Sequence, residues 1–356
     1  MTIDLDDVEA ITPIDPGDML GAITAMPQHV RTGFAAGNEA PGMPQADGVT
    51  SIVFAGMGGS AIAGDVLRTL ARGRLTVPVD VNRGPQLPVF CGPHALVICS
   101  SYSGNTAETL GAYADARERG CRIVAITSGG ELATRASADG QGIVSVPGGY
   151  VTRAAFGLIV FATLGAVGAV GLLPPSEPEV AQAADELERL MIALGPGVPR
   201  ADNPAKELAW NLGDRQPIIW GADGWAATAA ARWKGQFNEN AKILAWSSAM
   251  PELDHNEVEG WAPRQGEGSF VIALRHEGEH PDIAMRFEPS LAIARDAGAV
   301  TDEVWAAGST ELSRFLSLVA MGDLASTYHA IGRGVDPTPM DAIMRLKAYL
   351  AGRAGS

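Results

Sequence analysis

The chain has 356 residues, of which 46% are hydrophobic and 19% charged, a composition typical of a folded globular protein with room for two domains. Its formal net charge of −15 argues against general binding to nucleic acids or anionic membranes, because such binding requires clustered Lys and Arg. The three cysteines lack metal-binding spacing and the acidic N-terminus is unlike a signal peptide, so we expect a cytoplasmic protein without a bound metal.

After an N-terminal extension of helix and loop at residues 1–48, the first half of the chain alternates between predicted strands and helices. The predicted strands are Ser51–Ala55, Val77–Asn82, Ala95–Ser100, Arg122–Thr127 and Gly142–Val146, and helices are expected at Ala61–Arg72 and Thr106–Arg119. This alternation is typical of a parallel sheet with helices on both faces. We therefore predict a doubly wound α/β domain at residues 49–174.

The run from Ala154 to Leu173 contains no charged residue, and its length would be sufficient to cross a bilayer. The run is rich in Gly and Ala, Arg153 precedes it directly, and no basic cluster marks a cytoplasmic loop. We therefore predict a helix that is buried on all sides within the protein, and no membrane span.

The second half of the chain repeats the pattern of the first after a connector helix and linker at residues 175–200. Predicted strands and helices are Ile218–Gly221, Trp225–Lys242, Ser269–Leu274, Ile283–Ala297, Ala299–Trp305, Glu311–Gly332 and the terminal Met340–Leu350. We predict a second α/β domain at residues 201–356 that ends in an amphipathic helix, so that the two halves are copies of one architecture.

Two turns in the first half are rich in glycine and hydroxyl groups. The first, Gly56-Met57-Gly58-Gly59-Ser60, and the second, Ser100-Ser101-Tyr102-Ser103-Gly104-Asn105-Thr106, each follow an apolar strand and open a helix. Side by side on a parallel sheet, such turns would present free N–H groups and hydroxyls to a phosphate. The alternative is a pair of tight strand–helix turns with no ligand.

Two motifs in the second half carry groups that transfer protons. Glu239 lies between Asn238 and Asn240 near the end of a predicted helix, and His255 lies among acidic residues in Met250–Trp261. A carboxylate and an imidazole are suited to acid–base chemistry. Taken alone, the Glu239 motif favours a solvated helix end, and the His255 motif is a weak signal because surface histidines beside carboxylates are common.

The two turns resemble those of the sugar isomerase (SIS) domain, and from about Val49 onwards the chain resembles the bifunctional phosphoglucose/phosphomannose isomerase family. The segments that carry the second resemblance are Gly58-Gly59-Ser60, Ser101 to Thr106, Asn238-Glu239-Asn240-Ala241-Lys242, His255-Asn256-Glu257 and the late Lys347. Such a relationship implies two SIS-type doubly wound domains, each a parallel sheet flanked by helices. Family members tend to have a proline directly before the arginine that corresponds to Arg153, whereas this chain has Thr152.

The resemblance also implies a reaction, the interconversion of glucose 6-phosphate with fructose 6-phosphate through a cis-enediol, with mannose 6-phosphate left open as a second aldose. Glu239 would move the proton between C2 and C1, and Arg153 would lie beside the enediolate. His255, from the neighbouring subunit of a homodimer, and Lys347 would open the sugar ring. The phosphate would be held by Gly59, Ser60, Ser101, Ser103 and Thr106. No cofactor or metal is implied, and the active sites would lie at the dimer interface.

A rival hypothesis is a non-catalytic regulatory protein that binds sugar phosphates through paired SIS domains. Such a sensor requires the hydroxyl-rich turns but no group that transfers protons, so Glu239, His255 and Lys347 distinguish the two hypotheses. An amido-transferring sugar synthase is a weaker alternative, because the chain lacks an N-terminal cysteine and a glutamine-hydrolysing domain.

Overall fold

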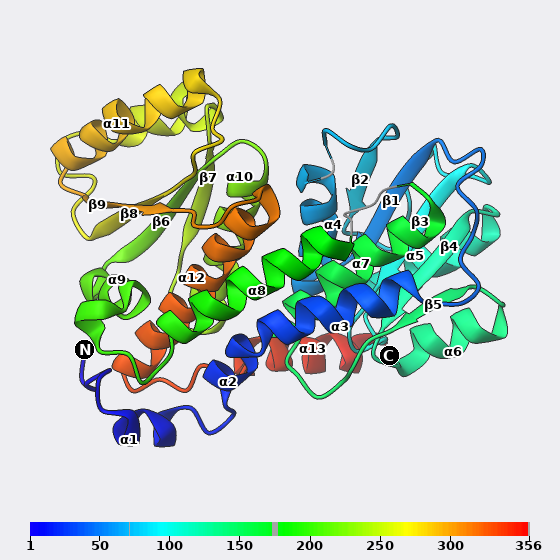
Figure 1. Ribbon diagram of the computed structural model, residues 1–356, viewed down its shortest axis with the longest axis horizontal. Helices are drawn as coiled ribbons and strands as arrows, with labels where there is room; N and C mark the ends of the chain where they lie inside the picture. Colours follow the sequence, from blue (N-terminus) through cyan, green and yellow to red (C-terminus); the bar gives the residue numbers. More distant parts are fainter. Residues whose placement is uncertain (71, 173–176, 355–356) are drawn as a thin grey trace.

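The computed structural model describes residues 1–70, 72–172 and 177–354, and its strands form two parallel β-sheets (Figure 1). The first sheet has the order β2-β1-β3-β4-β5 and contains β1 (Ser51–Gly56), β2 (Val79–Asn82), β3 (Ala95–Ser100), β4 (Arg122–Thr127) and β5 (Gly142–Ser145). The second has the order β7-β6-β8-β9 and contains β6 (Gln216–Ala222), β7 (Trp246–Met250), β8 (Ser269–Arg275) and β9 (Val300–Trp305).

Both sheets place their first strand between the second and the third, so the predicted repetition of one architecture is confirmed. In the first sheet the chain winds in opposite directions from β1, and the carboxyl ends of β1 and β3 flank this switch point, the position at which doubly wound folds bind ligands. The α/β class with two sheets was therefore predictable from the alternation of apolar strands and helices. The predicted boundary at residues 174–175 lies outside the described residues.

Strand β7 is the strand that the sequence prediction missed, beside the two short helices at Gly130–Ala138 and Pro204–Leu212. Its sequence Trp-Ser-Ser-Ala-Met has no apolar run or clear alternation, so periodicity gives no strand signal. The strand exists because its backbone pairs with β6 along Ile218–Ala222 in parallel register. Tertiary pairing at the edge of a sheet thus supplies what local propensity lacks.

Helices cover both sheets and fill the space between them (Figure 1). Those of the first half are α1 (Val8–Ile11), α2 (Met19–Thr24), α3 (Met26–Asn38), α4 (Gly58–Leu70), α5 (Ala107–Glu118), α6 (Gly130–Ala138) and α7 (Phe156–Val170). Those of the second half are α8 (Glu177–Ala193), α9 (Pro204–Leu212), α10 (Trp225–Glu239), α11 (Pro281–Asp296), α12 (Glu311–Gly332) and α13 (Asp341–Ala354).

Helix α7 is buried along almost its entire length, as predicted for the uncharged run that follows Arg153. It packs along α3 from the N-terminal extension, which in turn contacts α8, so residues before β1 contribute to the core. Among the described residues, no helix combines the length and apolar character that a membrane crossing requires.

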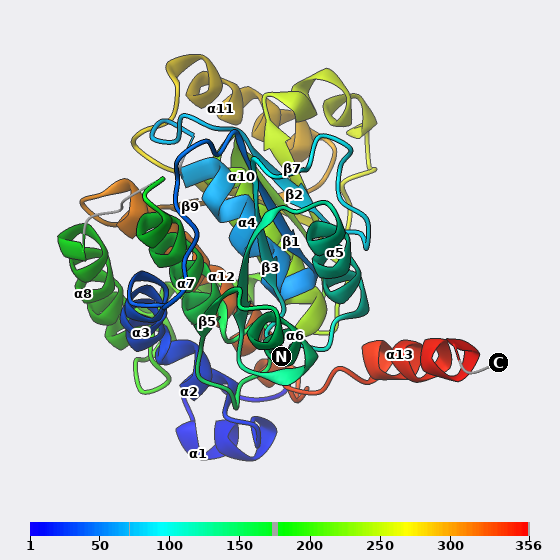
Figure 2. The ribbon, with the colours of Figure 1, turned by 90° about the vertical axis from the view of Figure 1, so that its right-hand side faces the viewer.

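Helices α4 and α10 face each other between the two sheets and run antiparallel (Figure 1). The end of α4 meets the start of α10, where the Thr228 hydroxyl lies 3.3 Å from that of Thr69. The terminal helix α13 is different, because it projects away from the body of the molecule (Figure 2). These two features determine which predicted site residues can meet within one chain.

Candidate functional site

The two hydroxyl-rich turns lie side by side at the carboxyl ends of β1 and β3. Gly56 and Ser100, the last residues of the two strands, are partners in the parallel register. The Tyr102 N–H donates a hydrogen bond of 3.3 Å to the hydroxyl of Ser60, in the first turn of α4. Ser101 and Thr106, at the start of α5, have their hydroxyl oxygens 2.9 Å apart. Three of the predicted phosphate-site residues are therefore brought together.

Ser103 lies at the exposed tip of the second turn, where its hydroxyl accepts a hydrogen bond of 3.3 Å from the Asn105 N–H. The neighbouring Gly104 has a φ of 72°, and a Cβ there would lie 1.8 Å from the Gly129 carbonyl oxygen. Only glycine fits this position, since a side chain would clash with backbone and strain the left-handed conformation. The turn thus presents the Ser103 hydroxyl to solvent.

Gly59 brings the first turn against the segment that carries Arg153. A Cβ at Gly59 would lie 3.1 Å from the Thr152 side chain, closer than most side chains tolerate, and 3.4 Å from the Arg153 backbone nitrogen. The missing side chain therefore permits the predicted phosphate site and Arg153 to approach each other. Although the sequence here has Thr152 in place of proline, the arginine is still held against this turn.

Arg153 is a buried cation, 2% exposed, whose Nη1 has no hydrogen-bond partner among the residues that the structure describes. Its Nε donates to the Asn240 Oδ1 at 2.6 Å, and its Nη2 donates to the carbonyl oxygens of Pro337 and Thr338 at 2.7 and 3.0 Å. Nη1 lies 3.6 Å from the Glu239 Oε2. Burial lowers the pKa of Arg153, and the charge of Glu239 opposes that effect.

Glu239 is the last residue of α10, and its side chain is 31% exposed, so it is open to a ligand. Lys242, three residues later, donates from Nζ to the Glu239 carbonyl oxygen and to the Pro337 carbonyl oxygen. Burial, followed by the charge of Arg153, lowers the pKa of Lys242. Lys242 stands in the Glu239 motif of the sequence, where no pattern predicted a role for it.

A buried ion pair holds the backbone of Arg153 in place. Arg232 on α10 donates to the Asp323 carboxylate on α12 at 2.6 and 3.0 Å, and also to the Arg153 carbonyl oxygen at 3.0 Å. Asp323 is fully buried; its burial raises its pKa, while Arg232 opposes the shift. Asn240 is fixed in turn by the Ser326 hydroxyl at 3.0 Å. The signal that sequence reasoning passed over was a lone aspartate in an apolar helix.

His255 lies at the opposite end of α10 from Glu239. It ends a 3-10 helix, Glu252–His255, that follows β7, and the Met250 carbonyl oxygen accepts a hydrogen bond of 2.8 Å from the Asp223 N–H just before α10. Since α10 has 15 residues, its ends are about 21 Å apart. His255 is exposed, and one chain does not bring it to Glu239.

Lys347 lies on α13, where every residue from Asp341 to Leu350 is exposed. The same helix exposes a set of large apolar side chains, which includes Ile343, Met344, Leu346 and Leu350. These four apolar side chains are therefore left 40–58% exposed on α13 in the part of the chain that the structure describes. The described residues also contain no group of three or more His, Cys, Asp or Glu that could hold a metal ion.

Comparisons with known proteins agree with this arrangement. Residues 201–350 match the bacterial phospho-glucose isomerase C-terminal SIS domain. The chain is 35% identical to the bifunctional phosphoglucose/phosphomannose isomerase of Caldicellulosiruptor bescii, over 94% of this chain and 99% of that protein. It is 34% identical to the D-glucosamine-6-phosphate 4-epimerase of Sulfolobus acidocaldarius, over 67% and 72%.

A solved structure shows the same fold. The crystal structure of a glucose-6-phosphate isomerase like protein from Thermus thermophilus superimposes with a TM-score of 0.65 at 20% identity, covering 95% of this chain and 98% of that one. Its low sequence identity makes it evidence for the fold alone. Given the similarity along nearly its full length to the Caldicellulosiruptor protein, the chain belongs to the bifunctional phosphoglucose/phosphomannose isomerase family.

Proposed function

We propose that the chain is an aldose–ketose isomerase that interconverts glucose 6-phosphate and mannose 6-phosphate with fructose 6-phosphate. The observation that carries this proposal is the buried Nη1 of Arg153, which forms no hydrogen bond within the described chain and lies 3.6 Å from the accessible carboxylate of Glu239. A buried donor without an acceptor is costly, and an oxygen of a bound substrate would satisfy it. A sensor of sugar phosphates has no need of a carboxylate at this point.

In the proposed reaction, Glu239 removes the proton from C2 of the open-chain aldose and returns it to C1 of the resulting cis-enediol. The oxygen that gains negative charge in this step would be stabilised by the Arg153 Nη1. The Nε and Nη2 atoms of Arg153 donate hydrogen bonds to Asn240, Pro337 and Thr338. These bonds hold the guanidinium in place before the substrate binds. The guanidinium therefore does not have to reorient as the charge develops.

The phosphate of the substrate would be bound by Gly59, Ser60, Ser101, Ser103 and Thr106. The first turns of α4 and α5 add N–H groups and a favourable helix dipole to these hydroxyls. The contact between Gly59 and the Arg153 segment would set the spacing between the bound phosphate and the reacting carbons. Binding energy from the phosphate would thus hold the open chain in register with Glu239.

Ring opening is assigned to His255 and Lys347, and this assignment requires a homodimer. His255 is separated from Glu239 of its own chain by the length of α10, so it would serve the site of the second subunit. Helix α13 has exposed apolar side chains that a second copy would cover, and Lys347 lies on the same helix. The active sites are accordingly proposed to form at the dimer interface.

The test is an assay of the purified protein with glucose, mannose and fructose 6-phosphates, with and without a metal chelator. We expect turnover of all three sugars that a chelator does not reduce. Glucosamine 6-phosphate, followed by NMR, tests the activity named for the Sulfolobus relative. If the protein epimerises glucosamine 6-phosphate and does not isomerise the other three sugars, the proposed isomerase function is wrong and an epimerase function takes its place. Binding without any turnover would instead favour the regulatory hypothesis.

A further inference from the structure

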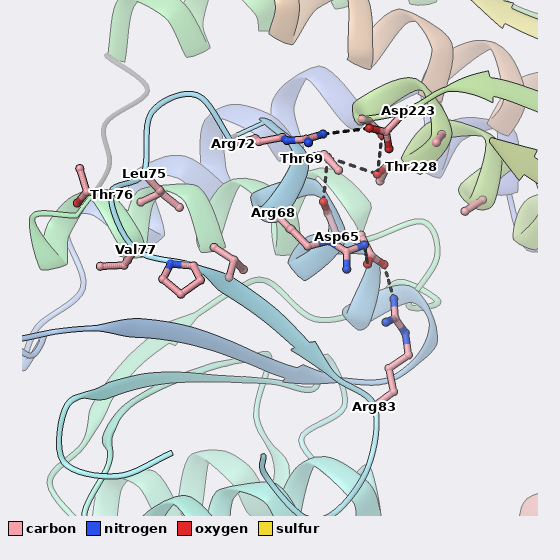
Figure 3. A pocket seen from close by; sticks show the side chains of 15 residues that line it. Asp65, Arg68, Thr69, Arg72, Leu75, Thr76, Val77, Arg83, Asp223 and Thr228 are labelled. Carbon is pink, nitrogen blue, oxygen red and sulfur yellow. Dashed lines mark hydrogen bonds and ion pairs between the residues drawn. The ribbon is translucent and has the colours of Figure 1, made fainter. Parts of the chain in front are cut away.

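A cleft between the two sheets lies far from Glu239, at the other end of α4 and α10. Its volume is about 760 Å³, enough for a small organic molecule. The second half of α4 and the segment leading into β2 form one wall, and Asp223 with the first two turns of α10 forms the other (Figure 3). This cleft is separate from the hydroxyl-rich turns, and from Glu239, which lie at the opposite ends of the same helices.

The cleft is locally positive in a chain whose formal net charge is −15. Three arginines line it, Arg68, Arg72 and Arg83, against two aspartates, Asp65 and Asp223, which leaves one positive charge in excess. Asp65 is shared by two of the arginines and is only 13% exposed. The planar guanidinium of arginine binds pairs of phosphate oxygens through two parallel hydrogen bonds, so this lining favours a phosphate-bearing ligand.

Arg72 is the arginine that is easiest to redirect toward a ligand. Among the described residues its ion-pair partner is Asp223, at 3.0 Å, and the two side chains are 74% and 57% exposed. Such an exposed pair contributes little to stability and is readily exchanged for a more highly charged partner. Figure 3 shows Arg72 reaching across the cleft to Asp223.

The second wall adds the start of helix α10, whose first N–H groups receive no side-chain cap from a described residue. Thr228, in the first turns of α10, has a hydroxyl that lies 3.3 Å from both the Thr69 hydroxyl and the Gly224 carbonyl oxygen. Leu75, Val77 and Pro78 provide an apolar border on the side of β2. A cationic centre with an apolar border fits a phosphate attached to a small organic group.

The same two helices frame the cleft and the site of Glu239. Helix α4 has Ser60 in its first turn and ends at the cleft, whereas α10 starts at the cleft and ends at Glu239. A ligand that bridges Arg72 and the start of α10 would change how the two helices lie against each other. The ligand would thereby change the distance between the hydroxyl-rich turns and the Glu239 carboxylate.

We propose that this cleft is a second, regulatory binding site for a small phosphate-bearing anion, coupled to the active site through α4 and α10. The coupling rests on the proposed isomerase function, but the binding itself does not. Reciprocity requires that substrate bound at the first site also changes affinity at the cleft.

Binding is tested by titrating the full-length protein with inorganic pyrophosphate in a calorimeter at constant ionic strength. We expect two bound ions per chain, one at each site. The cleft variant Arg72→Ala/Arg83→Ala should bind at least roughly tenfold more weakly at one site, because it lacks two charged donors. The variant Ser103→Ala/Thr106→Ala should weaken the other. The control Arg135→Ala removes an exposed, paired arginine from α6 and should leave both intact.

The outcomes separate the two proposals. A cleft variant that titrates like the wild type overturns the cleft site, whatever the enzymatic activity. A single site that is lost only in the cleft variant supports the cleft and contradicts the phosphate turns. Arg72→Ala alone provides a milder change if the double variant unfolds at a lower temperature than the wild type.

The regulatory half is tested by kcat at saturating hexose 6-phosphate, where competition at the active site is suppressed. Pyrophosphate should change kcat in the wild type and in Arg135→Ala but not in the cleft variant. An identical response in all three proteins, or none in any, would rule out coupling through α4 and α10.

Discussion

Arg153 donates hydrogen bonds to three acceptors, which leaves its Nη1 as the group that a ligand could bind. Asn240, Pro337 and Thr338 occupy Nε and Nη2, and Nη1 faces Glu239. This geometry makes Glu239 the residue on which the proposed chemistry depends. Its side chain is partly open to solvent, whereas the arginine is not.

Glu239→Gln is therefore expected to reduce kcat by at least roughly 100-fold, the range in which general acid–base groups contribute. KM should change only a few-fold, because the amide keeps the shape of the side chain and the hydroxyl-rich turns are unchanged. Steady-state kinetics with fructose 6-phosphate measures both. The control Glu118→Gln alters an exposed carboxylate at the far end of α5 and should behave as wild type. Retained turnover in Glu239→Gln would remove this residue from the mechanism.

The hydroxyls of the second turn give a separate prediction at the same scale. Ser103→Ala/Thr106→Ala should raise KM about 10- to 100-fold, since two hydrogen bonds to a charged group are lost. The effect on kcat should be smaller, because both hydroxyls are remote from the reacting carbons. Thr12→Ala, which removes an exposed hydroxyl on the N-terminal extension, is the matched control. An unchanged KM would place the phosphate elsewhere.

At the scale of elements, α10 and α12 hold the site through the buried Arg232–Asp323 pair. Asp323→Asn should lower the free energy of unfolding by about 3–5 kcal/mol, because it leaves a buried arginine without its counter-charge. The double variant Arg232→Met/Asp323→Leu should lose less stability, since no unpaired charge remains. Urea unfolding, followed by circular dichroism, measures both.

An exposed pair provides the comparison for this prediction. Glu131→Gln breaks the pair with Arg135 on α6 and should cost only about 0–1 kcal/mol. If Asp323→Asn is no more destabilising than Glu131→Gln, the buried pair does not support the site. The double variant is also expected to lose activity, because the Arg153 carbonyl oxygen loses its donor.

At the scale of the whole molecule, the separation of His255 from Glu239 predicts shared active sites. Glu239→Gln and His255→Ala proteins should each be nearly inactive. When they are mixed and allowed to exchange subunits, about a quarter of the wild-type activity should return, because half of the dimers are mixed and each has one complete site. The measurement is activity against mixing ratio after mild dissociation. Mixtures that stay inactive, although exchange is verified by a mass-tagged subunit, would contradict the shared site.

The dimer itself is tested through α13. Replacing Ile343 and Leu346 with serine should shift the protein from dimer to monomer in analytical ultracentrifugation, since these apolar side chains are exposed on α13 within the described chain. The matched control Met285→Ser changes an exposed apolar residue on α11. A dimer that persists in the first variant would locate the interface elsewhere.

The sequence by itself determined the fold class and most of the elements. Apolar runs such as Ala95–Ser100, followed by hydroxyl-rich turns, specify buried strands and helix starts locally, so the α/β class and the positions of the two turns could be predicted. Local pattern gave no strand signal at Trp246–Met250, and the role proposed for Glu239 came from the family resemblance and not from its neighbours in the chain.

Only the tertiary structure decided which of these residues meet. The contact of Gly59 with the Arg153 segment, the support of Arg232 by Asp323 and the cleft at Arg72 all join segments separated by about 80 residues or more. Spacing along the chain does not predict contacts between such distant residues, because these contacts depend on how the two sheets pack through α4 and α10. The same packing separates His255 from Glu239, because a rigid helix keeps its two ends a fixed length apart.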